Sequence, residues 1–261
     1  MRIAAWNILH GGGHKRMATI IVELLELQAD VIILNEFRAT MGGQLQAVLR
    51  DHGFEWQVLG GDPRVANVVL VAGKTELEKG EIPAANLRNR LVEVKLKESG
   101  LTLIGVHIPD ESQPTRRREA WQWVAGRAKT LSVEKCVIAG DFNTGRHKVD
   151  EAGETFTCTT FLGKLATAGY ADAFRTLHGR KWEETWVAPN GAKPLGKSEL
   201  SGFRLDGGFV SEQLREKVAK AEYGHEVRTK RVSDHSIFML EIDISGEALQ
   251  KICKKSREID Q

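Results

Sequence analysis

The stretch from residue 135 to residue 143 constrains the fold of this 261-residue chain more than any other part of the sequence. Residues 136–139 form an apolar run of the length of a buried strand, and Gly140 ends it. Asp141 and Asn143 follow directly, so an extended backbone would point both polar side chains to the same side. Side chains just beyond the carboxyl end of a strand line the crevice in which open sheets bind ligands. Taken alone, the pattern also fits a turn capped by Asx side chains, so its meaning depends on the rest of the chain.

Other predicted strands also meet polar side chains at their ends. In chain order the groups concerned are Asn7, Glu36, His107, Asp141, Asn143, Asp206, Asp234 and His235. Each has an ordinary explanation as a turn residue or a structural histidine, but eight of them are hard to assign to independent turns. Oxygen ligands without a thiolate favour Mg²⁺ or Mn²⁺ over zinc, and Mg²⁺ commonly binds one or two carboxylates together with substrate phosphate oxygens. The combination therefore points to hydrolysis of a phosphate ester.

The spacing of apolar residues predicts helices between these strands. The predicted helices cover residues 15–28, 44–52, 116–131 and 157–168. Residues 92–97 alternate apolar and charged side chains, which predicts a half-exposed strand with Val92 and Val94 on one side and Glu93 and Lys95 on the other. A turn at residues 99–100 joins it to a second strand, so the two form a hairpin.

The chain shows no boundary that would divide it into several domains. Residues 182–201 contain Pro and Gly at several positions and predict a long surface loop. No internal repeat, low-complexity tract or linker is found. We therefore expect a single catalytic domain at residues 1–245, followed by a basic tail at residues 246–261.

Composition narrows the class of protein and its compartment. Basic residues number 37 and acidic residues 35, so overall charge gives no argument for binding nucleic acid. The three cysteines lie far apart without metal-binding spacing, which argues against a zinc site or disulfide framework and fits a reducing compartment. No signal segment and no apolar stretch near ~18 residues is present, so we expect a cytoplasmic protein that does not insert into a membrane.

Six short segments form a set that is specific only as an ensemble. They are Ala5-Trp6-Asn7-Ile8, Ile33-Leu34-Asn35-Glu36, Val106-His107-Ile108-Pro109, Gly140-Asp141-Phe142-Asn143, Arg204-Leu205-Asp206 and Ser233-Asp234-His235. In this order they resemble the endonuclease/exonuclease/phosphatase superfamily, the metal-dependent phosphoesterases related to pancreatic deoxyribonuclease. The resemblance spans residues 5–235. It implies an α/β (α+β) fold of four layers, in which two packed mixed β-sheets are flanked by helices as in deoxyribonuclease.

Within the superfamily the chain is more similar to the exonuclease III branch of apurinic endonucleases. Residues 160–178, Thr185-Trp186 and residues 202–206 follow the pattern of that branch. Two positions depart from it: His107 stands where the branch usually has Tyr, and Gly207 replaces an aromatic residue. Both departures bear on specificity for abasic sites and leave the core chemistry unchanged.

The resemblance, together with side-chain chemistry, implies a set of metal ligands and substrate contacts. Glu36 is expected to hold the metal, with Asn7 helping directly or through water and Asp234 as a further support. Arg38 and Phe203 are expected to contact substrate.

The same reasoning implies the catalytic groups. Asp141 is expected to orient and deprotonate the attacking water, while Asn143 donates to the phosphoryl oxygens and also binds substrate. His235 is expected to stabilise developing negative charge, held by Asp206 through its other ring nitrogen. His107 is expected to hydrogen-bond the phosphate or to protonate the leaving oxygen.

We therefore predict a divalent-metal-dependent phosphodiesterase, in the first place an exonuclease III-like DNA nuclease acting at abasic sites or 3′ ends. Its basic groups at Lys15, Arg38, residues 116–118 or the 182–201 loop would contact the DNA backbone. The alternative is a phosphatase or phosphodiesterase for a small ester such as a nucleotide, sugar phosphate or lipid head group. A non-catalytic binding module is disfavoured because no core polar position is lost. We expect DNA as substrate, no obligate protein partner and a monomer.

Overall fold

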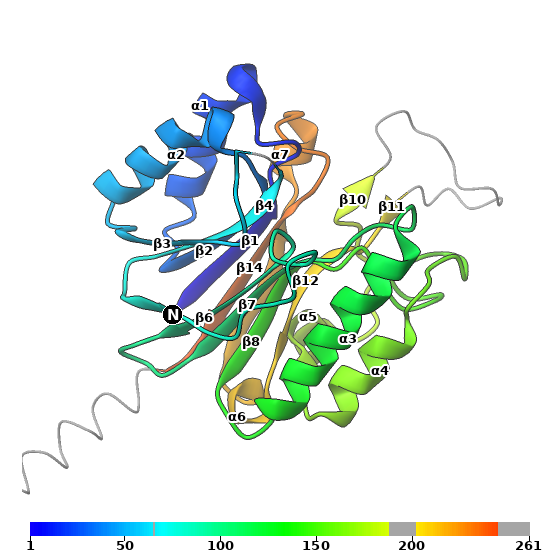
Figure 1. Cartoon of the computed structure of the whole chain (residues 1–261). Helices are drawn as coiled ribbons and strands as arrows, with labels where there is room; N and C mark the ends of the chain where they lie inside the picture. Colours follow the sequence, from blue (N-terminus) through cyan, green and yellow to red (C-terminus); the bar gives the residue numbers. More distant parts are fainter. Residues whose placement is uncertain (65, 188–201, 245–261) are drawn as a thin grey trace, which may run out of the picture.

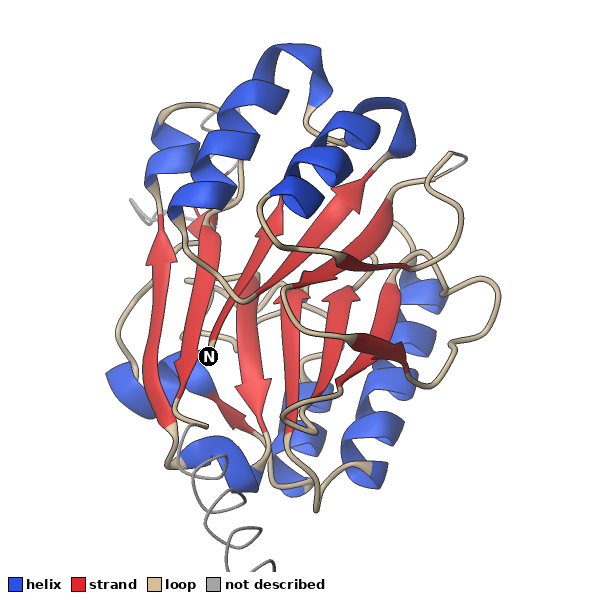
Figure 2. Cartoon of the chain, turned by 90° about the vertical axis from the view of Figure 1, so that its left-hand side faces the viewer, coloured by secondary structure: helices blue, strands red, loops and turns tan. Residues whose placement is uncertain are grey.

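The computed structural model describes residues 1–64, 66–187 and 202–244 of the chain. Two six-stranded β-sheets face each other, and helices cover the outer face of each sheet (Figure 1). The view in Figure 2 shows the strands of both sheets between two groups of helices. The four-layered sandwich of two mixed sheets flanked by helices is therefore confirmed.

Each sheet is built around one central parallel pair of strands. The first sheet has the order β13 (Val218–Gly224), β14 (Ile237–Ile242), β1 (Arg2–Asn7), β2 (Val31–Phe37), β4 (Val68–Gly73) and β3 (Trp56–Leu59). The second has the order β5 (Leu77–Lys79), β6 (Leu91–Leu96), β7 (Thr102–His107), β8 (Cys136–Asp141), β12 (Asp206–Val210) and β9 (Ala171–Asp172). The pairs β1–β2 and β7–β8 are parallel, and the other pairings in the two sheets are antiparallel.

Two helices pack on the outer face of each sheet. They are α1 (Gly13–Glu26) and α2 (Ala39–Asp51) on the first sheet, and α3 (Pro114–Thr130) and α4 (Thr160–Thr167) on the second. Short helices complete the connections: α5 (Ala173–His178), α6 (Glu212–Arg215) and α7 (Glu226–Thr229). None of the helices in the described ranges is long and apolar enough to cross a membrane.

Continuous apolar strands are needed because both faces of each sheet are covered. In β1, Ile3 and Ala5 enter the core between the two sheets, whereas Ala4 and Trp6 pack toward the helices. The period of two in a strand thus divides one apolar run between two cores. This is why the strand runs lack the apolar–polar alternation of a sheet that faces water.

The structure corrects several boundaries and one burial prediction. Glu93 on β6 is buried instead of exposed, because Arg127 of α3 binds it through two hydrogen bonds of 2.7 and 2.8 Å. The helix predicted at residues 44–52 begins earlier, at Ala39. The short strand β5 and the ribbon of β10 (Trp186–Val187) and β11 (Gly202–Phe203) were missed, so the predicted loop at 182–201 begins with a strand. Residues 188–201 and the predicted tail at 246–261 lie outside the described residues.

Candidate active site

Six strands bring polar side chains to one rim of the sandwich. The parallel strands β1, β2, β7 and β8 end there, and the antiparallel partners β12 and β14 begin there. In the second sheet His107 lies beside Asp141, and Asp141 beside Asp206; in the first, Asn7 lies beside Asn35. The topology alone therefore collects groups that lie up to about two hundred residues apart in the sequence.

A pocket of about 550 Å³ opens at this rim. It is lined by Asn7, Leu9, His10, Glu36, Asn67, Arg90, His107, Asp110, Glu111, Ser112, Asp141, Asn143, Phe156, Trp186, Phe203, Leu205, Asp234 and His235. Most of the predicted site residues are in this set. Asp206 lies behind His235 and contacts its ring. Arg38 does not line the pocket: it is exposed and donates to Asn67 at the pocket wall.

Glu36 reaches the pocket because β2 is irregular at this point. The register of β2 against β4 shifts between Leu34 and Phe37, and Glu36 has a φ of 61°. Bulges and left-handed backbone at a non-glycine residue re-aim side chains and are found at functional sites. Glu36 Oε2 accepts hydrogen bonds from the backbone N–H of His10 (2.6 Å) and the amide of Asn67 (3.3 Å). Its other oxygen faces the pocket.

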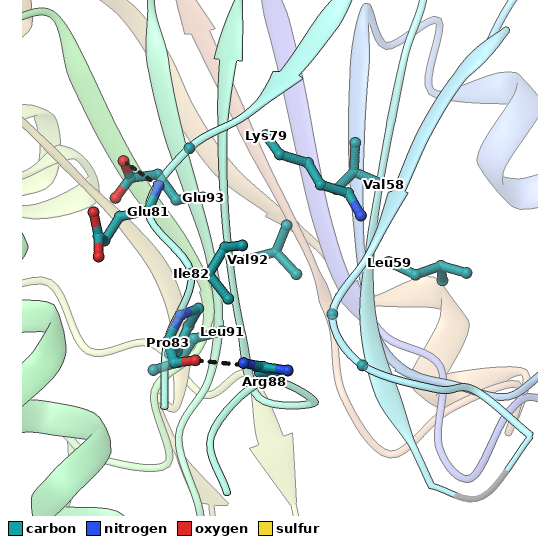
Figure 3. A pocket seen from close by; sticks show the side chains of 13 residues that line it. Val58, Leu59, Lys79, Glu81, Ile82, Pro83, Arg88, Leu91, Val92 and Glu93 are labelled. Carbon is teal, nitrogen blue, oxygen red and sulfur yellow. Dashed lines mark hydrogen bonds between the residues drawn. The ribbon is translucent and has the colours of Figure 1, made fainter. Parts of the chain in front are cut away.

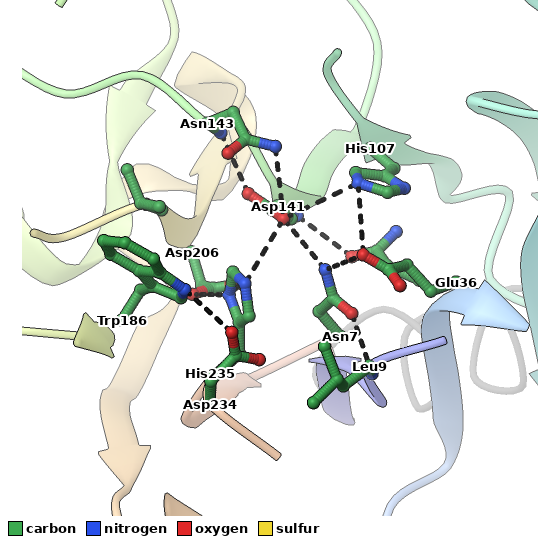
Figure 4. Close-up of polar contacts among 12 residues, drawn as sticks. Asn7, Leu9, Glu36, His107, Asp141, Asn143, Trp186, Asp206, Asp234 and His235 are labelled. Carbon is green, nitrogen blue, oxygen red and sulfur yellow. Dashed lines mark hydrogen bonds and ion pairs between the residues drawn. The ribbon is translucent and has the colours of Figure 1, made fainter. Parts of the chain in front are cut away.

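Asn7 is fixed with its amide nitrogen toward the carboxylates. Its Oδ1 accepts from the Leu9 N–H (3.0 Å), and its Nδ2 donates to Glu36 Oε1 (3.2 Å) and to Asp141 Oδ2 (3.0 Å). Figure 4 shows Asn7 between these two acidic side chains. In this orientation Asn7 supports a cation by placing the carboxylates, whereas direct ligation through Oδ1 requires the Leu9 bond to break.

Asp141 is a buried carboxylate at the centre of the pocket (Figure 4). Burial raises its pKa to about 7, and nearby Asp206 adds to the rise, while His235, Asn7 and the Asn143 N–H oppose it. The Asn143 N–H donates to Oδ1 at 2.9 Å. A carboxylate with a pKa near neutrality can take a proton from water, as a general base requires.

His235 and Asp206 form the imidazole–carboxylate pair predicted from the sequence. His235 Nδ1 is 2.9 Å from Asp206 Oδ2, and its Nε2 is 3.9 Å from Asp141 Oδ2. Burial disfavours the charged ring, but Asp206 and Asp141 outweigh it and raise the pKa of His235 to about 10. The ring is therefore cationic at neutral pH, with Nε2–H directed to the middle of the pocket.

The pKa of His107 is shifted in the opposite direction to that of His235. Burial, reinforced by the positive charge of Arg90, lowers its pKa well below 6.5, so the ring is neutral. Its Nε2 lies 3.8 Å from Asp141 Oδ2 and 4.0 Å from Glu36 Oε1. A neutral ring can still donate one hydrogen bond, as a tyrosine hydroxyl does, so the departure from Tyr preserves a neutral donor.

Asn143 is held by an arginine that the sequence placed on a DNA-binding surface. Arg117 is fully buried, and its Nη2 donates to the Asn143 carbonyl (2.7 Å) and to Thr144 Oγ1 (2.7 Å). The expectation that Arg117 contacts DNA is therefore wrong. Asn143 has a φ of 46°, and its amide donates to the Ile108 carbonyl at 2.9 Å. Asn143 Nδ2 also donates to Asp141 Oδ2 in a long hydrogen bond of 3.4 Å, so the amide lies between the Ile108 carbonyl and the pocket carboxylate.

An aromatic wall closes one side of the pocket. The Phe203 ring stacks on Trp186 with centroids 5.8 Å apart and meets the edge of Phe156 at 5.2 Å. The Trp186 indole N–H donates to Asp234 Oδ2 at 2.9 Å. The wall is therefore tied directly to one of the pocket carboxylates.

The pocket fits a divalent cation held by oxygen. Asp234 Oδ1 is buried and has no hydrogen-bond partner among the described residues, and Glu36 Oε1 also faces the pocket. Asp141, Asp206 and His235 place ligand atoms within 4.8 Å of one another, but the Asp206–His235 contact already occupies one of them. Glu36 and Asp234 thus each present to the pocket a carboxylate that forms no salt bridge with a lysine or arginine of the described residues, and oxygen of this kind is what a hard metal ion prefers.

One buried amide joins the two sheets directly beneath the pocket. Asn35 Oδ1 accepts from the Asp141 N–H (3.0 Å), and Asn35 Nδ2 donates to the Val106 carbonyl (2.9 Å). Gly140 allows this close packing, because a Cβ there would lie 2.1 Å from the Val106 oxygen. Asn35 immediately precedes Glu36, so it sets the spacing between the two acidic groups.

Gly207 lies behind the pocket and does not line it. A Cβ at Gly207 would be 3.4 Å from the hydroxyl of Tyr223 and 3.4 Å from Arg204 Nη1. Tyr223 of β13 thus fills the space beside this position. The presence of glycine instead of an aromatic residue at position 207 therefore affects the packing behind Asp206 and leaves the lining of the pocket unchanged.

A second pocket of about 310 Å³ lies between the outer strands of the two sheets (Figure 3). Its Glu93 carboxylate accepts from the Glu81 backbone N–H at 3.1 Å, and Arg88 Nε donates to the Pro83 carbonyl at 3.4 Å. It lacks the converging carboxylates, amides and imidazoles of the rim pocket. The rim pocket is therefore the candidate active site.

Arg90, Asn67 and Trp186 are pocket residues to which sequence reasoning gave no role. The predicted hairpin placed Arg90 just before its first strand, and the structure adds the register, in which Leu91 pairs with Val106 and Arg90 lies opposite His107. Asn67 likewise precedes β4, whose first residue pairs with Phe37 next to Glu36.

Comparison with known proteins agrees with this geometry. Among curated protein sequences none is significantly similar to the chain. Solved structures with the same fold include a 3′ phosphatase from Neisseria bound to a product DNA hairpin (19% identity, TM-score 0.76, covering 93% of this chain and 99% of that one). They also include an AP endonuclease from Archaeoglobus fulgidus (19% identity, TM-score 0.74, covering 93% of this chain and 99% of that one). A third is a 3′–5′ exonuclease from Neisseria meningitidis (19% identity, TM-score 0.76, covering 93% of this chain and 100% of that one).

The sequence also matches a family model. The match covers residues 4–235 and therefore includes the polar side chains of the pocket rim from Asn7 to His235. It confirms the predicted superfamily and the reaction class of a phosphoric ester hydrolase. The chain belongs to the endonuclease/exonuclease/phosphatase family.

Proposed function

We propose that this protein is a divalent-metal-dependent phosphodiesterase that cleaves DNA at abasic sites or 3′ ends by in-line attack of water. The observation that carries the proposal is the pairing of Asp141, whose pKa is about 7, with the cationic ring of His235 at 3.9 Å. One group can accept a proton from water while the other stabilises negative charge on the phosphoryl oxygens.

The remaining residues place the reacting groups. Glu36 and Asp234 would hold Mg²⁺ or Mn²⁺, which supplies Lewis-acid stabilisation of phosphoryl charge when bound. Asn7 holds Glu36 and Asp141 at a fixed spacing through its amide hydrogens. Asn143 presents one N–H to the phosphoryl group, and neutral His107 donates a hydrogen bond to it or to the leaving oxygen.

The aromatic wall supports a nucleic-acid substrate. Phe203 and Trp186 offer flat apolar surface beside the carboxylates, suited to a sugar or base next to the scissile phosphate. The solved structures with the same fold include one bound to a DNA hairpin and one AP endonuclease, which favours DNA over other esters. Arg38, exposed next to the pocket, is proposed to contact the backbone.

A phosphatase or phosphodiesterase for a small ester is the second candidate. It is favoured by the exposed Asp110 at the pocket mouth, whose negative charge would repel an extended polyanion.

One assay separates the two candidates. Abasic duplex, duplex with a 3′ phosphate, single strands and small phosphomonoesters are compared with Mg²⁺ and with EDTA, using Asp141→Ala as the inactive control. Cleavage of abasic or 3′-blocked duplex that EDTA abolishes is expected, and KM should rise with salt by a log–log slope of about 0.9 per phosphate contact. Hydrolysis restricted to small monoesters would reject the nuclease and establish the second candidate.

A further inference from the structure

The connection between β1 and α1 has an unusual backbone at the edge of the active-site pocket. Its five residues all have positive φ angles: 54° at Leu9, 51° at His10, 75° at Gly11, 82° at Gly12 and 67° at Gly13. Glycine adopts such angles freely, but for a residue with a side chain they are unfavourable and persist only where surrounding contacts impose them. We call residues 9–13 the left-handed turn. Its first two residues line the pocket, so the strained backbone lies at the site itself.

The left-handed turn directs two backbone N–H groups at side chains of the site. The Leu9 N–H donates to Asn7 Oδ1 (3.0 Å), which turns the Asn7 amide nitrogen toward Glu36 and Asp141. The His10 N–H donates to Glu36 Oε2 at 2.6 Å, which leaves Oε1 toward the pocket. Both donors would lose their direction if the turn relaxed to an ordinary backbone conformation.

Arg16 of α1 holds the left-handed turn in place. Its half-buried guanidinium donates three hydrogen bonds to main-chain carbonyls: Nη2 to Leu9 (2.7 Å), Nη1 to Ile8 (3.3 Å) and Nη1 to Val232 (2.5 Å). The first two carbonyls belong to the segment whose N–H groups orient Glu36. The third belongs to the segment that leads directly into Asp234. One side chain thus ties together the two segments on which the proposed cation ligands depend.

Arg16 makes these contacts without occupying the carboxylates. It forms no salt bridge with an acidic side chain in the described ranges of the chain. Burial lowers the pKa of Arg16, and the negative charges of Asp234 and Glu36 oppose that shift, so both carboxylates act on the guanidinium without bonding to it. Because Arg16 binds carbonyls instead, the carboxylate oxygens stay available to a hard metal ion.

We propose that Arg16 is a positioning residue for the cation site: it fixes the left-handed turn against the segment before Asp234 and thereby sets the spacing of Glu36 and Asp234. The inference rests on the proposed function, because it assumes that these carboxylates hold a divalent cation. Mg²⁺ tolerates little variation in ligand geometry, so a preset site binds it more tightly than a flexible one. The charge of Arg16 acts in the opposite direction, since a nearby guanidinium repels a cation. The two effects therefore change the affinity with opposite signs.

The test is the affinity of the metal-free protein for Mn²⁺, measured from the EPR signal of the free ion, which does not depend on catalysis. Arg16→Lys keeps the charge, but one ammonium group cannot reach all three carbonyls, so the Kd should rise by about 10-fold, the equivalent of one hydrogen bond. Arg16→Gln removes both charge and contacts and should also raise the Kd. The matched control is Arg50→Gln, which removes the same charge from an exposed position of α2 and should leave the Kd unchanged.

Two results would overturn the inference. An unchanged Mn²⁺ Kd in Arg16→Lys would show that the carbonyl contacts do not set the cation site. A lower Kd in Arg16→Gln would show that repulsion by the charge outweighs any support. If Arg16→Gln does not fold, the Kd of Arg16→Lys decides alone, because that variant isolates the contacts from the charge.

A role in stability alone is excluded by the activity of the same variant. Arg16→Lys should raise the Mg²⁺ concentration for half-maximal activity but leave kcat at saturating Mg²⁺ near the wild-type value, because Arg16 contacts neither Asp141 nor His235 by a hydrogen bond. A purely structural arginine would lower the Tm and leave the Mn²⁺ Kd of the folded protein unchanged.

The inference and the proposed function fail in different ways. Mn²⁺ binding that depends on Arg16 in a protein that cleaves no DNA would reject only the DNA substrate. DNA cleavage with Mg²⁺ and an unchanged Mn²⁺ Kd in Arg16→Lys would reject only the role of Arg16.

Discussion

The active-site pocket and the ion network directly behind it use the same kinds of side chain in opposite ways. We define the network as Arg204, Asp150, Asp172, Arg175 and Tyr223. In the network each acid meets a base: Arg204 binds Asp150 at 2.6 Å and Asp172 at 2.5 Å, and Arg175 also binds Asp150. These mutual contacts complete the network without any ligand.

The pocket, in contrast, contains three buried or half-buried carboxylates that no lysine or arginine of the described residues neutralises through a salt bridge: Glu36, Asp141 and Asp234. Arg90, the one arginine among the described residues that line the pocket, contacts His107 and forms no salt bridge with a described carboxylate. Charged side chains without a partner in a buried pocket are unfavourable for folding, and they are found where a ligand supplies the opposite charge. This difference indicates that the network stabilises the fold, whereas the pocket binds a ligand.

The two regions are joined through Asp206. The Tyr223 hydroxyl donates to the Asp206 carbonyl at 2.9 Å, and Arg204 Nη1 is 3.2 Å from the same hydroxyl. The Thr185 hydroxyl accepts from the Asp206 N–H at 3.0 Å. The network thereby fixes the residue that orients His235.

The largest expected effect is on catalysis, at the centre of the pocket. Asp141→Asn removes the proton acceptor and should lower kcat by about 10²- to 10⁴-fold, the range of general acid–base assistance. The free energy of unfolding should not fall, because burial disfavours the charged form of this carboxyl. The measurement is steady-state hydrolysis with denaturant unfolding in parallel, and Asp110→Asn at the exposed rim is the control. Near-wild-type kcat in Asp141→Asn would remove Asp141 as the base.

The corresponding change in the network should act on stability. Arg204→Met leaves Asp150 and Asp172 buried without their shared cation and should lower the free energy of unfolding by about 3–5 kcal/mol. Urea unfolding measures this loss. Arg146→Met, which removes a more exposed contact to Asp172, should cost about 0–1 kcal/mol. Equal losses in the two variants would show that the network does not differ from surface ion pairs.

The third prediction concerns pH. The folded-state pKa of His235 is about 10, above its ordinary value of 6.5, so its contribution to stability is complete below pH 6.5 and is lost as pH rises through about 10. Asp206→Asn removes the main group that raises this pKa, so the loss should begin at lower pH. NMR titration of the His235 ring in metal-free protein measures the shift, worth about 1.4 kcal/mol per unit. A ring that titrates identically in both proteins would contradict the assignment.

The smallest expected effect is at the contact between the aromatic wall and the carboxylates. Trp186→Phe keeps an aromatic ring but removes the N–H donor to Asp234, so the Mg²⁺ concentration for half-maximal activity should change by about 2- to 10-fold, the equivalent of one hydrogen bond. Trp182→Phe is the matched control, because that indole donates to Glu184, which does not line the pocket. An identical Mg²⁺ dependence in all three proteins would separate the wall from the cation site.

Much of the candidate site could be predicted from the sequence. Asn7, Glu36, His107 and Asp141 each lie at the end of a short apolar run that predicts a strand, so their position at strand ends is a local property. Arg117 shows the limit of such reasoning. A run of three arginines on a helix predicts an exposed surface, but in the folded protein Arg117 is buried and donates to the carbonyls of Pro109 and Asn143. Asn35 shows it too, since its partners lie on the opposite sheet.

The sequence by itself determined the long central strands and the polar side chains at their ends, because period, burial and turn residues act over a few neighbouring positions. The tertiary structure decided which of these charges are neutralised inside the protein and which stay unpaired. Arg204 pairs with Asp150, whereas Arg90 has no carboxylate in salt-bridge contact within the described ranges, and both outcomes depend on distances between strands far apart in the chain. Only the packing of the two sheets sets those distances.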